Sequence, residues 1–361
     1  MKRIFFACIT TVCLLMLASC ANTGGVAVPA SGMVPTSGIA PTRVDPDWVR
    51  DPYTRFDRQT YLAAVGSGNS RTAAERDALG RLVSIFGQSI QVDERIVDSY
   101  RQAVGSGAAA SWAHTTTIDT AIVASAGMDT LIGAEIRDFW ADGRGNNFAV
   151  AVLNIPRARQ IYSEVLRANK EIIDGLTSMP LSERNSIDGF SRFQFAAVFA
   201  DMNISNGEVL SVLGAPQYAK GLRRGDDFRR EANEIARAIP IRINVRNDMA
   251  GRIESAFAGV FSELGFNTGG ANPRYLLNVD VLAQPVDQAR QNVVFTRLEV
   301  TANLIDTRNG STLLPYNFNL REGHRNQSEA NNRAFAVAER RISNEFRDIM
   351  SAYMSRLNPR N

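Results

Sequence analysis

The last third of the chain carries the pattern that most restricts its fold. Four segments there alternate apolar and polar residues, which is typical of strands with one buried face. Two other segments space their apolar residues as a helix does. The expected strands are 241–245, 275–281, 294–304 and 314–320, and the expected helices are 249–264 and 335–353. This β-α-β-β-β-α order, over residues 240–358, predicts a mainly antiparallel sheet with one face covered by two helices.

Turn and edge signals agree with that sheet. Asn309-Gly310 is a hairpin turn signal between the last two strands, and Pro315 in the final strand argues for a sheet edge. Arg297, Glu299 and Asn303 alternate with inward apolar residues, so the uncovered face of the sheet is a candidate binding surface. The competing interpretation for any one of these residues is an ordinary solvated sheet.

Residues 59–178 predict another, smaller α+β module, which we call the first module because it precedes the second module at 240–358. Tyr61 to Val65 indicates a strand, Gly66 and Gly68 indicate a turn, and a helix capped by Ser70 or Thr72 follows. That helix should bury Ala74, Ala78, Leu82 and Ile85. A hairpin of strands 132–140 and 148–153 comes next, and the first of these strands should place Ile132, Ala134, Ile136 and Trp140 on one face. A helix that begins at Pro156 follows, and it should bury Ile161, Val165, Ala168, Ile172 and Leu176.

The segment between the modules, residues 179–239, predicts a helical connector. Within it, 223–231 mixes Arg with Asp and Glu, and we interpret it as a solvated helix face. In the second module, the polar stretch 285–292 is expected to be a projecting hairpin loop.

The N-terminus has the features of a secretory signal, predicted over residues 1–19. Lys2 and Arg3 precede an apolar stretch too short to span a membrane. The stretch ends in Leu17-Ala18-Ser19-Cys20, the cleavage pattern of bacterial lipoprotein precursors, which predicts Cys20 as the lipid attachment site. Ordinary cleavage or an uncleaved anchor is the alternative.

After Cys20 the chain predicts a flexible tether over residues 20–58, rich in Pro, Gly and Ser. Ala21 stands where an Asp commonly signals inner-membrane retention. The expectation is therefore an outer-membrane anchor through the acylated Cys20, with the protein facing the periplasm; display on the cell surface is the alternative.

The first module resembles a bacterial family of outer-membrane lipoproteins whose type member is a twenty-kilodalton lipoprotein. The resemblance rests on Tyr61-Leu-Ala-Ala-Val-Gly66-Ser-Gly68 and on Ile132-Gly-Ala-Glu-Ile-Arg-Asp-Phe-Trp140 with the strand after it, and covers roughly 61–165. It implies an envelope lipoprotein without known enzymatic activity, some relatives being tied to motility organelles. It carries over Cys20 as the lipidation site and Gly66 and Gly68 as turn positions.

The sequence gives no sign of catalysis, metal binding or a cofactor. Its two histidines, His114 and His324, lie far apart, and Cys20 is the one cysteine left after cleavage, so no zinc ligand set is predicted. Glu135 and Asp138 could in principle form a carboxylate pair for glycan cleavage, but they should lie on opposite faces of their strand because their separation in the sequence is odd. Gly66-Ser67-Gly68 lacks the third glycine of a nucleotide-binding turn.

Net charge gives no reason to expect nucleic acid or an anionic membrane as the main partner, and no nucleic-acid partner is predicted. Of the 40 Lys and Arg, two lie in the first three residues, and the other 38 nearly balance 37 Asp and Glu. The chain is therefore expected to be a non-enzymatic binding or scaffold component of a periplasmic assembly, in motility or cell-wall machinery. The alternatives are a glycan or small-ligand binder and a self-assembling ring component, so a homo-oligomer stays open.

Overall fold

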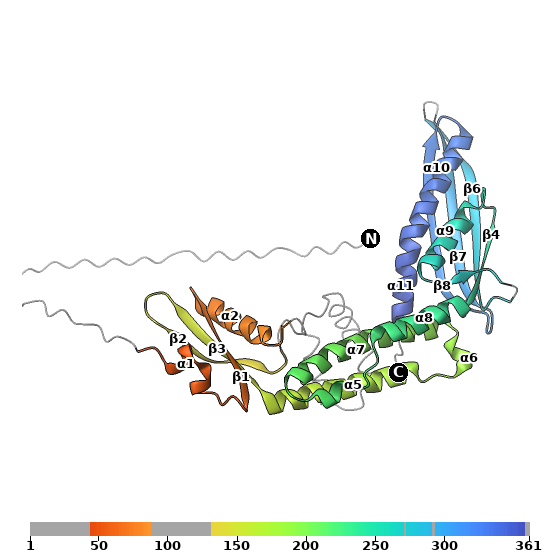
Figure 1. Ribbon diagram of the computed structural model, residues 1–361. Helices are drawn as coiled ribbons and strands as arrows, with labels where there is room; N and C mark the ends of the chain where they lie inside the picture. The colour runs from red at the N-terminus through yellow and green to blue at the C-terminus, as the bar shows by residue number, and fades with distance from the viewer. Residues whose placement is uncertain (1–43, 88–130, 271, 291–292, 358–361) are drawn as a thin grey trace, which may run out of the picture. The chain divides into compact units, whose positions relative to one another are not determined.

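The computed structural model describes residues 44–87, 131–270, 272–290 and 293–357, and from 287 to 290 only the backbone. Asp45 to the C-terminus groups as one unit by its internal contacts. The unit contains two sheets packed by helices, which confirms the predicted α+β class (Figure 1). Among the described residues, no helix is long and apolar enough to cross a membrane.

The first sheet has three antiparallel strands in the order β1-β3-β2. They are β1 (Tyr61–Gly68), β2 (Ala134–Ala141) and β3 (Asn147–Asn154). Helix α2 (Arg71–Ser84) packs on one face, with Ala74, Ala78 and Leu82 fully buried as predicted. Ile85 is 42% exposed, contrary to the prediction, because α2 ends one residue before it and Phe86 fills the core instead. Ser70, and not Thr72, caps α2 by accepting from the Ala73 N–H.

The prediction that Gly66 and Gly68 form a turn is wrong. Both lie inside β1 and pair with Ala149 and Asn147 of β3. A Cβ at Gly66 would lie 2.6 Å from the Ala78 Cα, and one at Gly68 would lie 2.6 Å from the Ala73 Cβ. These glycines are therefore needed for the close approach of α2 to the strand.

The predicted tether is also too long at its C-terminal end. Residues 47–50 form helix α1 (Asp47–Arg50), and a 3-10 turn, η1 (Pro52–Thr54), follows. Trp48 is only 4% exposed and packs with Ala63, Val150 and Val152 on the face of the sheet opposite α2. A large aromatic side chain buried in this way holds the segment on the sheet.

A β-bulge at Arg137 overturns two predictions for β2. The register with β3 shifts between Ile136 and Asp138, so one extra residue occupies the edge strand. Glu135 pairs with Val152 and Asp138 with Val150, which puts both carboxylates on the same face. For the same reason Trp140 lies on the face opposite to Ile136, packed against Phe148.

Long helices connect the two sheets. They are α5 (Ile155–Thr177), α6 (Leu181–Arg184), α7 (Ile187–Val212) and α8 (Gly225–Ala238), with the 3-10 turn η3 (Pro216–Ala219) before α8. The N-terminal part of α5 and the C-terminal part of α7 complete the core of the first sheet. The other ends of both helices belong to the core of the second sheet.

The second sheet has the order β5-β4-β6-β7-β8, and the predicted β-α-β-β-β-α elements are present together with one short strand, β5, that was not predicted. Its strands are β4 (Pro240–Arg246), β5 (Asn267–Thr268), β6 (Tyr275–Arg290), β7 (Val293–Asp306) and β8 (Ser311–His324). The pairs β6-β7 and β7-β8 are antiparallel, whereas β4 is parallel to both neighbours. Strand β8 is an edge, as Pro315 predicts. The predicted loop 285–292 is wrong in part, since Pro285 and Val286 continue β6 opposite Thr296 and Phe295.

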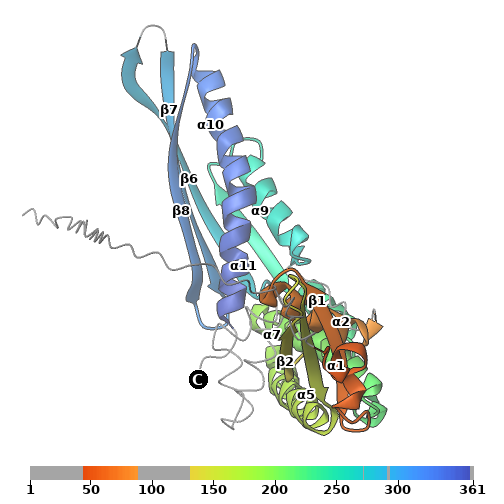
Figure 2. The same cartoon turned by 90° about the vertical axis from the view of Figure 1, so that its left-hand side faces the viewer.

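One face of this sheet is covered by helix α9 (Arg252–Glu263) and by the C-terminal helix (Figure 2). The latter consists of α10 (Gln327–Arg341), a π-helical turn η4 (Ile342–Phe346) and α11 (Arg347–Arg356). Phe335, Ala338, Ile342 and Phe346 are buried as predicted, but beyond the π turn Met350 is fully buried and Ile349 only partly.

Candidate functional site

The predicted lipidation motif Leu17, Ala18, Ser19 and Cys20 lies outside the described residues, as do His114 and residues 20–43 of the tether. Within the described part of the chain, no three His, Cys, Asp or Glu side chains gather as a metal site would require. His324 stands at the end of β8, with its Nδ1 buried and without a hydrogen-bond partner.

The carboxylates of the first-sheet hairpin are held by neighbouring groups. Asp138 forms an ion pair with Arg55, and Glu135 pairs with Arg137 at 2.8 Å. Asp142 accepts from the Arg144 N–H at 2.6 Å and from Asn146, and these hydrogen bonds lower its pKa from the ordinary range. The bulge thus brings Glu135 and Asp138 to one face, but each has its own cationic partner.

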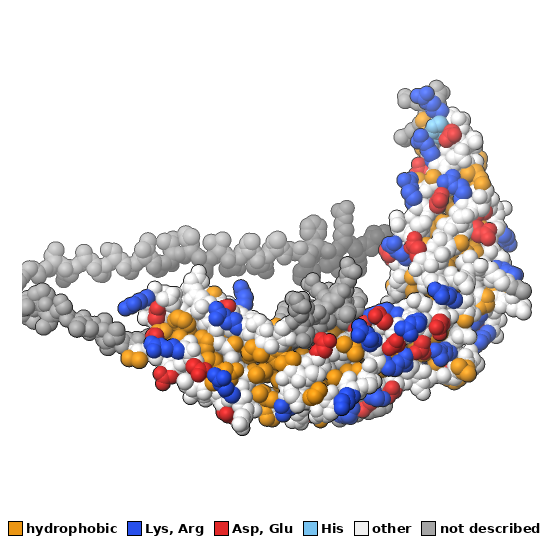
Figure 3. Space-filling view, viewed as in Figure 1, with side chains coloured by type: hydrophobic (Ala, Val, Ile, Leu, Met, Phe, Trp, Pro, Cys, Tyr) orange, Lys and Arg blue, Asp and Glu red, His pale blue; other side chains and the backbone are white. Residues whose placement is uncertain are grey.

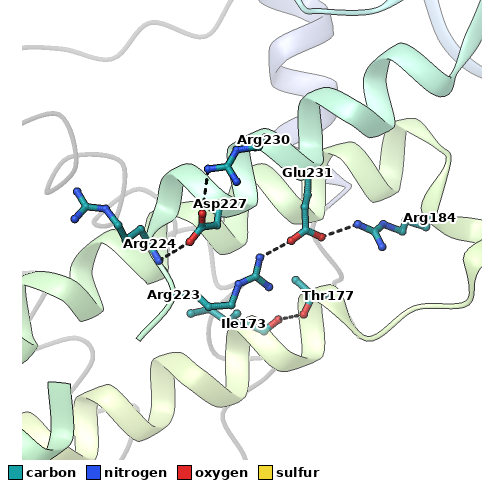
Figure 4. Close-up of polar contacts among 8 residues, drawn as sticks. All are labelled: Ile173, Thr177, Arg184, Arg223, Arg224, Asp227, Arg230 and Glu231. Carbon is teal, nitrogen blue, oxygen red and sulfur yellow. Dashed lines mark hydrogen bonds and ion pairs between the residues drawn. The ribbon is translucent and has the colours of Figure 1, made fainter. Parts of the chain in front are cut away.

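The Arg-rich segment of the connector is a network of ion pairs along α8 (Figure 4). Glu231 accepts from Arg184 at 2.6 Å and also from Arg223, and so ties α6 and the loop before α8 to that helix. Asp227 accepts from the Arg224 backbone N–H and from Arg230. Basic and acidic side chains alternate over this region in Figure 3, so the segment presents no patch of one sign.

A surface rich in polar side chains is the side of the second sheet opposite its helices, which we call the outer face. Alternate residues of β4, β6, β7 and β8 point there, because the others fill the core. Arg297 and Glu299 are exposed and Asn303 is partly exposed, as the sequence predicts.

Five asparagines occupy the centre of the outer face. They are Asn244, Asn278, Asn303, Asn317 and Asn319, and strand register places the first three side by side across β4, β6 and β7. Asn317 lies opposite Thr301 in the next row, and Asn319 lies opposite Glu299 in the row after that. In the described structure none of these carboxamides makes a hydrogen bond within the chain.

The charges of the outer face are arranged around these amides. Arg246 forms a bidentate pair with Asp280, Nη2 to Oδ2 at 2.7 Å, and this pairing lowers the pKa of Asp280 and raises that of Arg246. Arg297 lies directly opposite Arg321 in the β7-β8 register, in the row beyond that of Glu299 and Asn319. Two cations in directly opposed positions repel each other.

Phe295 holds one of these arginines in place. Its ring lies on the outer face beside Gly323, where a Cβ would come within 2.6 Å of the ring carbon Cε1. The Arg321 guanidinium lies 4.1 Å from the ring centroid, a distance typical of a cation–π contact. Gly323 therefore makes room for the ring that supports Arg321.

The amide rows were missed in the sequence analysis. The signal for them was present, because Asn278, Asn303, Asn317 and Asn319 each fall at an outward position of an alternating strand. Only the register between strands shows that residues as far apart in the sequence as Asn244 and Asn319 form one surface.

Comparison with known proteins adds partial structural similarities. No family model matches the sequence, and no curated protein matches it. A secreted protein from Helicobacter pylori is similar with a TM-score of 0.39 and 13% identity, over 78% of this chain and 97% of that one. A minor lipoprotein from Acinetobacter baumannii (TM-score 0.25, 14% identity, 32% of this chain and 93% of that one) is similar over a smaller part. So is a lipoprotein from Neisseria meningitidis (0.21, 16%, 28% and 96%). All three TM-scores are below 0.5, so these similarities do not establish a shared fold or function.

Proposed function

We propose that this chain is a lipid-anchored protein of the bacterial envelope that acts by binding and not by catalysis. The observation that carries the proposal is the N-terminal sequence, in which Leu17-Ala18-Ser19-Cys20 ends a charged and then apolar signal of the right length. Ala21 after the cysteine supports an outer-membrane anchor with the folded part in the periplasm.

The binding role is supported by the outer face. It offers many polar groups on a rigid sheet, while the carboxylates that sequence motifs could have assigned to catalysis are engaged by arginines. We propose that the protein is a component of a periplasmic assembly, in motility or cell-wall machinery, and that the segment after Cys20 gives it reach from the membrane.

The anchor is tested with the Cys20→Ser variant. Expected is loss of metabolic palmitate labelling and movement of the chain from the membrane fraction to the fraction released without detergent, because a serine hydroxyl does not receive the thioether-linked lipid. Cys13→Ser, inside the predicted signal, is the matched control and should keep both properties. If Cys20→Ser stays labelled and membrane-bound, the proposal is wrong.

The binding role is tested by crosslinking in living cells, followed by affinity recovery and mass spectrometry. Recovery of defined motility or cell-wall components supports a role in that assembly. Recovery of the chain alone, or only of its own copies, contradicts the proposed partner and points to self-assembly.

A further inference from the structure

We infer that the outer face binds an acidic glycan polymer, such as the glycan of the bacterial cell wall with its carboxylate-bearing peptides; the inference rests on the proposed periplasmic location and gives the binding role a chemical partner. The central observation is the set of carboxamides on β4, β6, β7 and β8 that have no partner within the described structure.

Hydrogen-bonding capacity points to a ligand rich in hydroxyl groups. Each carboxamide has two donor hydrogens and an acceptor oxygen, and the Thr301 hydroxyl beside them can also donate and accept. A sugar hydroxyl has the same double character, so it can pair with either end of an amide. A surface of this kind satisfies a polyhydroxylated ligand without a fixed orientation for each group.

The shape of the surface points to a polymer and not to a small molecule. Small ligands bind in concave pockets that bury most of their surface. Here the polar groups lie on an open sheet and repeat about every 4.8 Å across strands and about every 6.8 Å along them. A chain of repeating sugar units can engage several rows at once, which compensates for weak single contacts.

The apolar groups of the outer face argue against a protein partner there. Protein interfaces have an apolar, well-packed centre surrounded by polar groups. On this surface amides and charged groups predominate at the centre, with Pro315 beside Asn303 and Leu282 beside Glu299. Leu276 with Ile305 lies at one end, and Val286 with Phe295 lies at the other. Leu282, 46% exposed, is separated from both.

Charge decides between a neutral and an acidic glycan. The outer face has four arginines, Arg242, Arg246, Arg297 and Arg321, against two acids, Asp280 and Glu299. Arg246 and Asp280 neutralise each other. Arg297 and Arg321 lie opposite each other, with Glu299 in the neighbouring row, and a ligand carboxylate beside them would reduce their mutual repulsion.

The test is co-sedimentation of the full-length lipidated protein, in detergent, with purified cell-wall sacculi, a glycan polymer whose attached peptides carry carboxylates. A neutral insoluble polysaccharide such as cellulose is the comparison. We expect saturable binding to sacculi that weakens as salt is added, because salt screens the attraction between the arginines and the carboxylates. Binding to cellulose, which has no carboxylates, should be clearly weaker.

Variants of the outer face identify the surface. The double variant Asn278→Ala with Asn303→Ala, and separately Arg297→Glu, should each weaken sacculus binding by about tenfold or more, the loss expected from one or two polar contacts. Asn332→Ala and Arg333→Glu make the same chemical changes at exposed positions of α10 and should leave binding unchanged. Circular dichroism confirms that all variants are folded.

The outcomes separate this inference from the proposed function. Binding that the outer-face variants do not alter, or no binding at all, overturns the inference, and equal binding to cellulose overturns the acidic glycan. Loss of a crosslinked protein partner in cells with these variants, without loss of sacculus binding, shows that the face docks protein instead. Failure of the Cys20→Ser test removes the membrane anchor but leaves polymer binding by the purified chain measurable.

Discussion

Strand β1 meets helix α2 at Gly66, and the contact leaves no room for a side chain. The space a Cβ would need is already occupied by the backbone of Ala78, which cannot move without the whole helix. A clash with a flexible side chain could be relieved by a change of rotamer. A clash with backbone can be relieved only if the whole helix moves.

The residue-scale prediction is that Gly66→Ala destabilises the protein by about 3 kcal/mol, near the upper end of typical overpacking costs. The matched control is Gly80→Ala in helix α2, where a Cβ meets nothing within 4 Å. That change should instead stabilise by about 0.5–1 kcal/mol, because alanine is the better helix former. Urea unfolding of both variants measures the difference, and equal effects at the two sites would contradict the close contact.

Tyr162 makes the free energy of unfolding depend on pH in the alkaline range. Its phenol is buried, accepts from the Ile132 N–H at 3.1 Å, and has a pKa raised by burial to about 12 from the ordinary 10.0. Below about pH 10 both folded and unfolded chains keep the proton, so the stability is fully present. Between about 10 and 12 the unfolded chain ionises first, and the free energy of unfolding should fall.

Tyr162→Phe tests this directly. The variant should lose about 1 kcal/mol at neutral pH through the missing hydrogen bond, and its alkaline decline should be shallower by one proton. Tyr353, whose burial also raises its pKa to about 12, stays in both chains, so some decline remains. If denaturant titrations of the variant give the same dependence on pH as the original chain, Tyr162 ionises at the same pH in the folded and unfolded states, and the prediction is wrong.

At the scale of elements, regular patterns in the sequence identified the strands and helices, and irregular residues escaped. The alternation in β7 and β8 and the helical spacing in α5 were sufficient to predict those elements and their buried faces. Arg137 was not recognisable as a bulge, because its register depends on β3, and the outer-face amides depend on register in the same way. Local sequence does not encode which strands become neighbours.

The C-terminal helix shows a second irregularity with a physical cause. Its fully inward residues from Ala334 to Met354 recur every four positions: Ala334, Ala338, Ile342, Phe346, Met350 and Met354. In an α-helix each step of four advances about 40° past a full turn, so six such residues would wind around the helix. The π turn at Ile342–Phe346 takes up the excess and keeps the stripe on the sheet.

The prediction for an element concerns α1. Trp48→Ala should lower the free energy of unfolding by about 3–5 kcal/mol, as expected for removing a large aromatic side chain from a core. Val44→Ala, four residues earlier and 84% exposed, should have no measurable effect. Thermal unfolding followed by circular dichroism compares the two; a silent Trp48→Ala would mean that the segment belongs to the tether after all.

For the whole molecule, the decisive feature is that α5 and α7 each contribute to both hydrophobic cores. Leu166 and Val209 pack with the first sheet, whereas Ile172 and Phe199 pack with the second core. Where the two helices meet, Asn169 donates to Asn203 at 2.9 Å in a buried contact that fixes their alignment. Helices α5 and α7 are thus shared parts of both cores.

We therefore predict one cooperative unfolding transition from Asp45 onward. Trp48 and Trp140 both pack on the first sheet, so their fluorescence reports on that module in a Trp112→Phe background. Far-ultraviolet circular dichroism reports on all helices and strands. The two transitions in urea should coincide, since loss of either core exposes helices that the other needs. Fluorescence that changes well before circular dichroism would show that the modules unfold separately.

The protected sheet edges have a consequence for crowding. The edge strand β8 contains Pro315, and the edge strand β2 contains a bulge flanked by charges. If the chain is anchored by a lipid, its copies are confined to a surface and collide far more often than in free diffusion. An open, regular strand edge would then recruit neighbours into growing sheets. At these two edges, although not at β1 and β5, the irregularity opposes sheet growth between crowded copies on a membrane.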